Sequence, residues 1–325
     1  MLKGVVTGLA IGTSGMALAD GTVWSVRPSF DNEDARYEIS GLTCAGSDGA
    51  GRWCFAVNDE KSYGQFFTLD IERRRLRPKK RLRLLPKEGF DEADLEGAAY
   101  HDGYVYALGS HGLSRTGQEF QRSRFFIYRF PVDPVTGAPG FEVKRKSVVD
   151  QVERSDVLLP LLRGLTGLGA TPERSVIDNL GNFEGLAVRG GRLFAGFRAP
   201  SDRQGAAILD VALDHVFGDA PAEAVIHRLD LGMRYGVRDL APFDDGFLVL
   251  ASAESVPELI PIIWFWRPGT APLLLRALPV PPGWKAEGLL PLGPAAAPGG
   301  ERVLLVFDSQ KNGAPLEFVI PAPGR

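Results

Sequence analysis

A short hairpin motif recurs five times along the chain, and this repetition limits the possible folds more than any other feature of the sequence. Its clearest copy spans residues 94–111, where two runs of alternating apolar residues flank Asp102-Gly103, a dipeptide typical of tight β-turns. Because the strands of a hairpin are antiparallel, the polar residues that begin the first strand and end the second lie at one end. The other copies span residues 39–58, 182–198, 237–252 and 286–308.

The runs that follow each hairpin indicate the architecture. Every copy is followed by a third predicted strand, at 65–71, 124–130, 206–211, 262–266 and 316–320. Four copies have a fourth, at 81–85, 141–149, 224–229 and 273–278. The last copy lacks one, whereas residues 22–26 form a strand without a nearby partner. The sequence therefore predicts an all-β fold, a β-propeller of five four-stranded blades closed by the N-terminal strand, with 20–325 as a single domain.

One interval between the copies is longer than the others. The equivalent positions are Ser40, Glu96, Glu184, Arg238 and Glu287. They are separated by 56, 88, 54 and 49 residues, and the interval of 88 could hold a sixth blade, which is the alternative. The excess, residues 150–182, has leucines and valines at near-helical spacing, which favours five blades and a partly helical insertion beside the central opening.

The N-terminus has the pattern of an export signal. A basic start, a short apolar middle and the ending Ala17-x-Ala19 predict a signal peptide, residues 1–19, cleaved after Ala19. We therefore expect a periplasmic or secreted protein, and a disordered cytoplasmic N-terminus is the alternative. No later apolar run approaches the roughly 20 residues of a membrane span, so none is expected.

The two cysteines, Cys44 and Cys54, fall on opposite strands of the first hairpin. A loop centred on Gly49 pairs Cys44 with Cys54 and Ser40 with Asn58, and directly opposed residues lie within disulfide reach. A disulfide agrees with export. The alternative is two buried free thiols, the usual state in the cytosol.

The starts of the first strands define the predicted site. In a propeller these strands line the central channel, so Glu96, Glu184 and Glu287 should converge at one mouth. Like charges in such a ring require a cation, a shared proton or the guanidinium of Arg238. Carboxylates without a histidine triplet suit Ca²⁺ or Mg²⁺ as the cofactor and argue against zinc. The alternative is a structural ring whose carboxylates accept backbone N–H groups from the next blade.

Other polar residues are expected around the same mouth. We predict His111 as a general base, and Arg198 and Arg238 as the groups that hold an anion. The remaining candidates are Glu38, Asn58, Asp59, Asp94, Asn182, Asp239, Glu254 and Asp308. A small anionic molecule is therefore the expected ligand, and no organic cofactor is expected. An ordinary hydrogen-bonding histidine and solvated arginines are the alternatives.

Composition gives no reason to expect nucleic-acid binding. The net charge is −3 and charged residues are 24% of the chain, which is ordinary for a globular protein. Eight Lys or Arg residues lie between Arg73 and Arg83. We predict this run in a loop between the third and fourth strands of the first blade, on the face opposite the site, as a solvated rim. Contact with an anionic envelope surface is the alternative.

The motif copies also carry a family resemblance. They read Asp94-Leu-Glu-Gly, Asn182-Phe-Glu-Gly-Leu-Ala and Lys285-Ala-Glu-Gly-Leu, with Leu108-Gly-Ser-His-Gly and Gly196-Phe-Arg-Ala-Pro200 beside them. These segments resemble a bacterial propeller family described as a domain of unknown function. The resemblance implies kinship with phytase-like esterase propellers and, more remotely, with calcium-dependent gluconolactonase and paraoxonase propellers. Arg238-Asp239 departs from the Glu-Gly of the other copies, which puts a calcium ring of the usual kind in doubt.

Three functions follow from these observations. The first is an exported hydrolase of phosphoesters, esters or lactones, in which the three glutamates hold a divalent cation. The second is a non-catalytic propeller that binds a small anionic ligand or a protein partner. The third is a scaffold whose interaction surfaces lie on the rim. The fold itself does not choose between them, since propellers host many unrelated functions.

Overall fold

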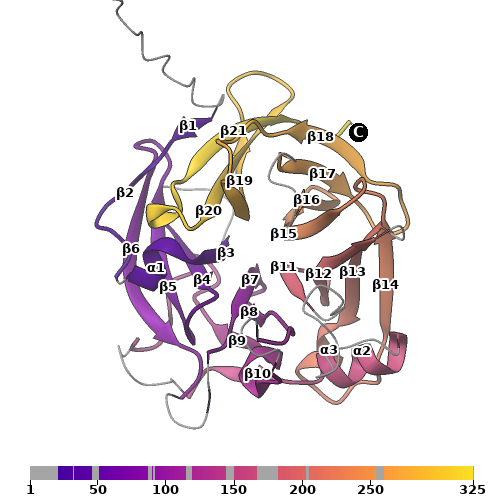
Figure 1. The fold of residues 1–325 in the computed structure, drawn as a ribbon. Coiled ribbons are helices and arrows are strands. Elements are labelled where there is room, and N and C mark those ends of the chain that lie inside the picture. Colours follow the sequence, from indigo (N-terminus) through magenta and orange to yellow (C-terminus); the bar gives the residue numbers. More distant parts are fainter. Residues whose placement is uncertain are drawn as a thin grey trace, which may run out of the picture.

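The computed structural model describes residues 21–31, 33–45, 51–86, 90, 92–114, 119–143, 150–166, 182–202, 205–253 and 260–324. Five sheets surround one central axis, and each sheet is a blade (Figure 1). The prediction of a five-bladed propeller is thus confirmed, and the six-bladed alternative is wrong. None of the described helices has the length and apolar character that a transmembrane helix requires.

Within each blade the strands run outward from the axis in chain order. The first blade contains β3 (Ile39–Cys44), β4 (Arg52–Asn58), β5 (Tyr63–Asp70) and β6 (Arg75–Arg83). The second contains β7 (Leu95–His101), β8 (Tyr104–Gly109), β9 (Ile127–Pro131) and β10 (Glu153–Ser155). The third contains β11 (Phe183–Arg189), β12 (Arg192–Asp202), β13 (Gly205–Ala212) and β14 (Ala224–Leu229).

The last two blades follow the same plan. The fourth contains β15 (Tyr235–Phe243), β16 (Gly246–Ala253), β17 (Ile262–Trp266) and β18 (Leu273–Ala277). The fifth contains β19 (Lys285–Pro294), β20 (Gly300–Asp308), β21 (Leu316–Pro321) and, from the N-terminus, β1 (Thr22–Val23). The short helices are α1 (Glu33–Tyr37), α2 (Leu158–Thr166), α3 (Leu213–Val216) and the 3₁₀ turns η1 (Arg122–Phe125) and η2 (Lys311–Gly313).

The N-terminal segment closes the ring, as predicted. Strand β1 pairs antiparallel with β21, with Thr22 opposite Glu317. The next strand of the same segment, β2 (Ser25–Val26), pairs in parallel with β6 of the first blade. Buried Trp24 lies between the two strands, and its Nε1 donates to Glu317 at 2.7 Å. This segment therefore ties the last blade to the first.

Two predicted fourth strands need correction, one in its boundaries and one in its position. In the first blade the strand begins at Arg75 rather than at residue 81, so most of the basic run lies on β6 and not in a loop. Leu76 and Leu82 are buried on this strand, whereas Lys79 and Lys80 are exposed and the arginines are half-buried, so the surrounding charge obscures the apolar alternation. In the second blade β10 pairs with β9, whereas Phe141 lies outside any strand and packs on Phe130. Residues 144–149 of that prediction lie outside the described residues.

The insertion is partly helical, as expected, but its helix lies at the outer edge of the ring and not beside the central opening (Figure 1). Helix α2 buries Leu158 and Leu162 in the apolar core beside the second and third blades. Pro160 is its third residue, in the first turn, where a missing N–H costs no helical hydrogen bond. Residues 167–181 lie outside the described residues.

Apolar side chains between neighbouring blades form the core. Phe55 packs edge to face on Phe66 and on Phe130 of the next blade, with ring centroids 5.0 Å apart in both pairs. A disulfide joins Cys44 of β3 to Cys54 of β4, and these residues are directly opposed, as predicted. The packing of blade against blade fixes how the innermost strands surround the channel.

Candidate functional site

Each innermost strand has an extra residue at the equivalent point of the repeat. The pairing of first and second strands shifts by one residue at Ser40, Glu96, Glu184, Arg238 and Glu287. Such a β-bulge leaves one residue without a partner in the ladder and re-aims its side chain. The sequence predicted these positions but not the bulge. Ile39, rather than Ser40, is therefore opposite Asn58.

Glycine follows the bulged residue in four of the five copies because the inner strands nearly touch there. A Cβ atom on Gly97 would lie 2.7 Å from the carbonyl oxygen of Glu184 in the next blade. In the fourth copy Asp239 takes this place. Its carboxylate accepts the N–H of Leu240 at 2.8 Å and of Leu289 at 2.7 Å. Asp239 therefore joins β15 to β19 below the mouth and supports the structural alternative for that one carboxylate.

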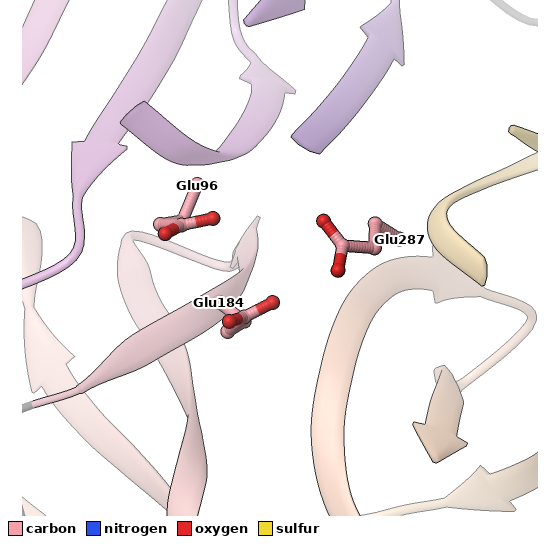
Figure 2. Close-up of side chains that lie close together, drawn as sticks. All are labelled: Glu96, Glu184 and Glu287. Carbon is pink, nitrogen blue, oxygen red and sulfur yellow. The ribbon is translucent and has the colours of Figure 1, made fainter. Parts of the chain in front are cut away.

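The three predicted glutamates do converge. Glu96, Glu184 and Glu287 each have a carboxylate oxygen within 4.8 Å of the others, and all three residues are buried. Figure 2 shows the carboxylates pointing toward one another from three different blades. They come from β7, β11 and β19, and this group is called the glutamate triad below.

Two arginines reach into the triad. Arg238 Nη1 donates to Glu184 Oε2 and to Glu287 Oε1, at 3.2 Å each, and its Nε donates to Ser252 Oγ at 2.9 Å. Arg198 donates to the other oxygen of Glu184. Although burial opposes ionisation, these two guanidinium groups lower the pKa of Glu184. Glu184 is therefore the ionised and compensated member of the triad.

The other two carboxyl groups have less compensation. Burial and the neighbouring charge of Glu184 raise the pKa of Glu287 to about 8, although Arg238 opposes this. Burial, followed by the charges of Glu184 and Asp94, raises the pKa of Glu96 well above its ordinary value. Glu96 is 4% exposed, and its side chain forms no hydrogen bond or ion pair with the residues that the structure describes. If all three glutamates were ionised, the two guanidinium groups would leave one negative charge uncompensated, and the raised pKa values show that Glu96 and Glu287 instead retain protons in the absence of a cation.

A second group of acids lies beside the triad. Burial and the charge of Glu287 raise the pKa of Asp59 to about 8, and its Oδ1 is buried without a hydrogen bond among the described residues. Burial and the adjacent Asp308 raise the pKa of Glu38 to about 7. Asp308 pairs with Lys285 at 3.1 Å. The mouth is therefore more acidic than basic.

The remaining predicted residues hold the frame of the site. Asp94 pairs with Arg124, a buried cation that the sequence analysis missed. No signal in the sequence identifies it, because the loop before β9 brings the Arg124 carbonyl to the His111 N–H just beyond the end of β8. Asn58 bridges the turn after β4, where its Nδ2 donates to the Tyr63 carbonyl at 2.9 Å. Buried Asn182 accepts the Arg198 N–H through its carbonyl at 2.9 Å. Glu254 lies outside the described residues.

His111 lies in an aromatic environment rather than on the open surface. Its ring is fully buried, with the centroids of Phe125 and Phe183 at 5.5 and 5.2 Å. Nδ1 lies 2.9 Å from the Gly109 carbonyl, which can only accept, so Nδ1 carries the proton. Nε2 has no partner among the described residues, and burial lowers the pKa of His111 to about 4. The ring is therefore neutral near pH 7, and its role as a general base stays a prediction.

Comparisons with known proteins place the chain in a sequence family. A family described as "Protein of unknown function (DUF3616)" matches residues 72–126 and 119–257, which together cover more than half of the chain. No curated protein matches the sequence.

Among solved structures the chain is similar to glycoside hydrolases at low identity. The GH43 protein BlXynB, as a mutant, from Bacillus licheniformis has 8% identity and a TM-score of 0.46, with 90% of this chain and 54% of that chain covered. An exo-1,5-α-L-arabinanase from a bovine ruminal metagenomic library has 12% identity and a TM-score of 0.43, with 89% and 95% covered. Zg3597, a family 117 glycoside hydrolase from Zobellia galactanivorans, has 10% identity and a TM-score of 0.45, with 93% and 89% covered. The chain thus spans about half the length of the Bacillus licheniformis protein.

Proposed function

Since the chain belongs to the DUF3616 family, a family without an assigned function, we propose a function from the site itself. The mouth of the propeller binds a divalent cation, Ca²⁺ or Mg²⁺, through the glutamate triad. At that ion the protein acts as a hydrolase of phosphoesters, esters or lactones.

The observation that carries the proposal is the state of Glu96. Ionisation of Glu96, which is 4% exposed and has no hydrogen bond or ion pair with a residue that the structure describes, is costly because burial removes water without supplying a compensating charge. A cation between Glu96 and Glu287 would compensate both, with Glu184 as the third oxygen ligand. Carboxylate oxygens are the ligands that Ca²⁺ and Mg²⁺ prefer.

A bound divalent ion would polarise a phosphoryl or carbonyl oxygen and lower the pKa of a bound water. The chain's own contribution is a proton acceptor close to the triad. Asp59 fits this role, because its pKa of about 8 lies near neutrality and one of its oxygens makes no hydrogen bond among the described residues. His111 remains the predicted alternative, but its ring is enclosed by Phe125 and Phe183.

The second candidate function, binding of a small anionic ligand, has less support. Arg198 and Arg238 were predicted to hold the anion, yet both donate to Glu184. Their charges are therefore partly used within the protein, whereas negative charge at the mouth is in excess. The disulfide supports a site of action outside the cytoplasm, in agreement with the predicted signal peptide.

The test is turnover of three chromogenic or pH-reporting substrates, 4-nitrophenyl phosphate, 4-nitrophenyl acetate and δ-valerolactone. Protein treated with EDTA should be inactive, and added Ca²⁺ or Mg²⁺ should restore hydrolysis of one of them. Glu96→Gln should abolish the restored activity. The control Glu223→Gln should not, because the Glu223 side chain is 79% exposed and lies directly before β14. Binding of the ion without turnover of any substrate would refute the hydrolase and leave the cation site standing.

A further inference from the structure

We propose that a cavity between the first and second blades binds a small aromatic carboxylate. The cavity has a volume of about 540 Å³ and lies between strands β4, β5 and β6 and residues 139–143, the segment that leads from β9 toward β10. Its size lies within the range of small-ligand sites, about 300–1,000 Å³. None of the described residues that line it belongs to the glutamate triad, so the proposed hydrolase function does not use it.

The floor of the cavity is aromatic. Buried Phe66 and half-buried Trp53 and Phe141 line it, together with Pro78 and Pro139. Trp53 packs edge to face on Phe66, with ring centroids 6.0 Å apart. Aromatic rings prefer offset or edge-to-face contacts with other rings, and such contacts contribute more than the burial of the same area alone. The floor therefore favours a flat, unsaturated ligand.

The exposed lining residues form a charged entrance, and these are Asp31, Lys79, Lys80 and Glu142. A β-bulge brings its two lysines to the same cavity, because Phe66 of β5 is opposite both Lys79 and Lys80 of β6. Successive residues of a regular strand point to opposite faces, whereas a bulge re-aims its side chains. Buried Gln65 fixes this geometry, since its Nε2 donates to the Lys79 carbonyl at 2.7 Å and its Oε1 accepts the Asp31 N–H at 3.1 Å. One side chain thus holds both sides of the entrance.

The charge of the entrance favours an anion. Lys79 Nζ lies 6.0 Å from the centroid of the tryptophan ring in the floor, so its ammonium group is placed beside the aromatic surface. Neither Lys79 nor Lys80 forms an ion pair with the residues that the structure describes. Asp31 pairs with Arg81 at 3.3 Å, so three cations and the carboxylates of Asp31 and Glu142 leave an excess of one positive charge. A carboxylate whose ring lies on the floor can pair with these ammonium groups.

The test is calorimetric titration of the intact protein with 2-naphthoate and with 2-naphthamide, its neutral analogue of the same shape. The acid should bind roughly fivefold or more tightly than the amide, as expected for partly exposed ion pairs. The Lys79→Gln, Lys80→Gln double variant, which replaces only exposed side chains, should remove this preference without weakening the binding of the amide. The control Arg73→Gln removes a cation of the same basic run outside the cavity, so it should bind the acid like the wild-type protein.

Two further measurements test the aromatic floor. Trp53→Leu should weaken the binding of both the acid and the amide, and decahydro-2-naphthoate, the saturated acid, should bind the wild-type protein more weakly than 2-naphthoate. Each variant is used only with a wild-type melting temperature, and the wild-type comparison of the three ligands stands without any variant. No binding of 2-naphthoate, equal affinity for the acid and the amide, or equal affinity for the aromatic and the saturated acid would overturn the proposal. Binding that the lysine double variant leaves unchanged would also overturn it, because the ligand would then occupy another site.

Discussion

The Nη1 atom of Arg238 lies 3.2 Å from Glu184 Oε2, although 54 residues separate the two in sequence. The same atom lies 3.2 Å from Glu287 Oε1, so one guanidinium connects the third, fourth and fifth blades. Arginine thus replaces the repeated glutamate at the position where two neighbouring carboxylates need compensation. This pairing leaves Glu96 as the residue on which the cation hypothesis depends.

Removal of the Arg238 charge should destabilise the fold. Arg238→Leu leaves Glu184 and Glu287 without one of their cations in a buried site, so we expect a loss of about 3–5 kcal/mol in the free energy of unfolding. Urea denaturation measures it. The control Arg73→Leu, whose side chain is 65% exposed, should change stability by about 1 kcal/mol or less. Equal, small effects for both variants would mean that the ring does not depend on Arg238.

Without a cation, stability should fall as the pH rises through the neutral range. The pKa of Glu287 is raised from 4.5 to about 8 in the folded protein, so the unfolded chain loses this proton first. The contribution of protonated Glu287 to the free energy of unfolding is therefore fully present below about pH 4.5. It is lost as the pH approaches 8, by up to about 1.4 kcal/mol per pH unit. Denaturation in EDTA across this window measures the slope, and Glu287→Gln should reduce it. A slope unchanged by that variant would refute the assignment.

Glu184 should act in the opposite direction. Its pKa is lowered in the folded protein, so its contribution is present above the pKa of the unfolded chain and is lost as the pH falls through the folded value. Glu184→Gln should therefore have a lower free energy of unfolding than the wild-type protein before acidification. This free energy should also change less as the pH falls. An acid transition as steep as that of the wild-type protein would contradict this reading.

The Cys44–Cys54 disulfide should contribute measurable stability although its loop is short. The two residues are 10 apart, for which the chain-entropy relation gives about 2–3 kcal/mol. Reduction should lower the free energy of unfolding by this amount, and the Cys44→Ser, Cys54→Ser double variant should be insensitive to reductant. Titration of two free thiols in the unreduced protein would contradict the bridge.

Closure by the N-terminus should be essential for the fold. Deletion of residues 20–27 removes β1 and β2 and exposes the edges of β21 and β6, so the melting temperature should fall sharply. Trp24→Ala, which removes a buried ring and the donor to Glu317, should cost about 3–5 kcal/mol, whereas Val23→Ala, at a 61% exposed position, should be nearly neutral. A truncated protein that melts like the intact one would refute the closure.

The repeat made the fold and the triad predictable, because equivalent positions in a closed ring must meet at its axis. What escaped prediction depends on contacts between distant segments. The bulges at Glu96 and Glu184 leave no mark beyond the glycine that follows them, and the pairing of Arg124 with Asp94 requires the path of the loop before β9. The outer strand β10 is three residues long and lies in the insertion, so its sequence pattern is too short to identify.

Calorimetric titration of EDTA-treated protein with Ca²⁺ at a pH of about 8 tests the central claim most directly, because the cation must replace protons on Glu96 and Glu287. We expect one ion per chain, weaker binding at a pH of about 6, a rise in melting temperature on binding and loss of all three effects in Glu96→Gln. The absence of binding by wild-type protein with either Ca²⁺ or Mg²⁺, or binding that Glu96→Gln leaves unchanged, would contradict it.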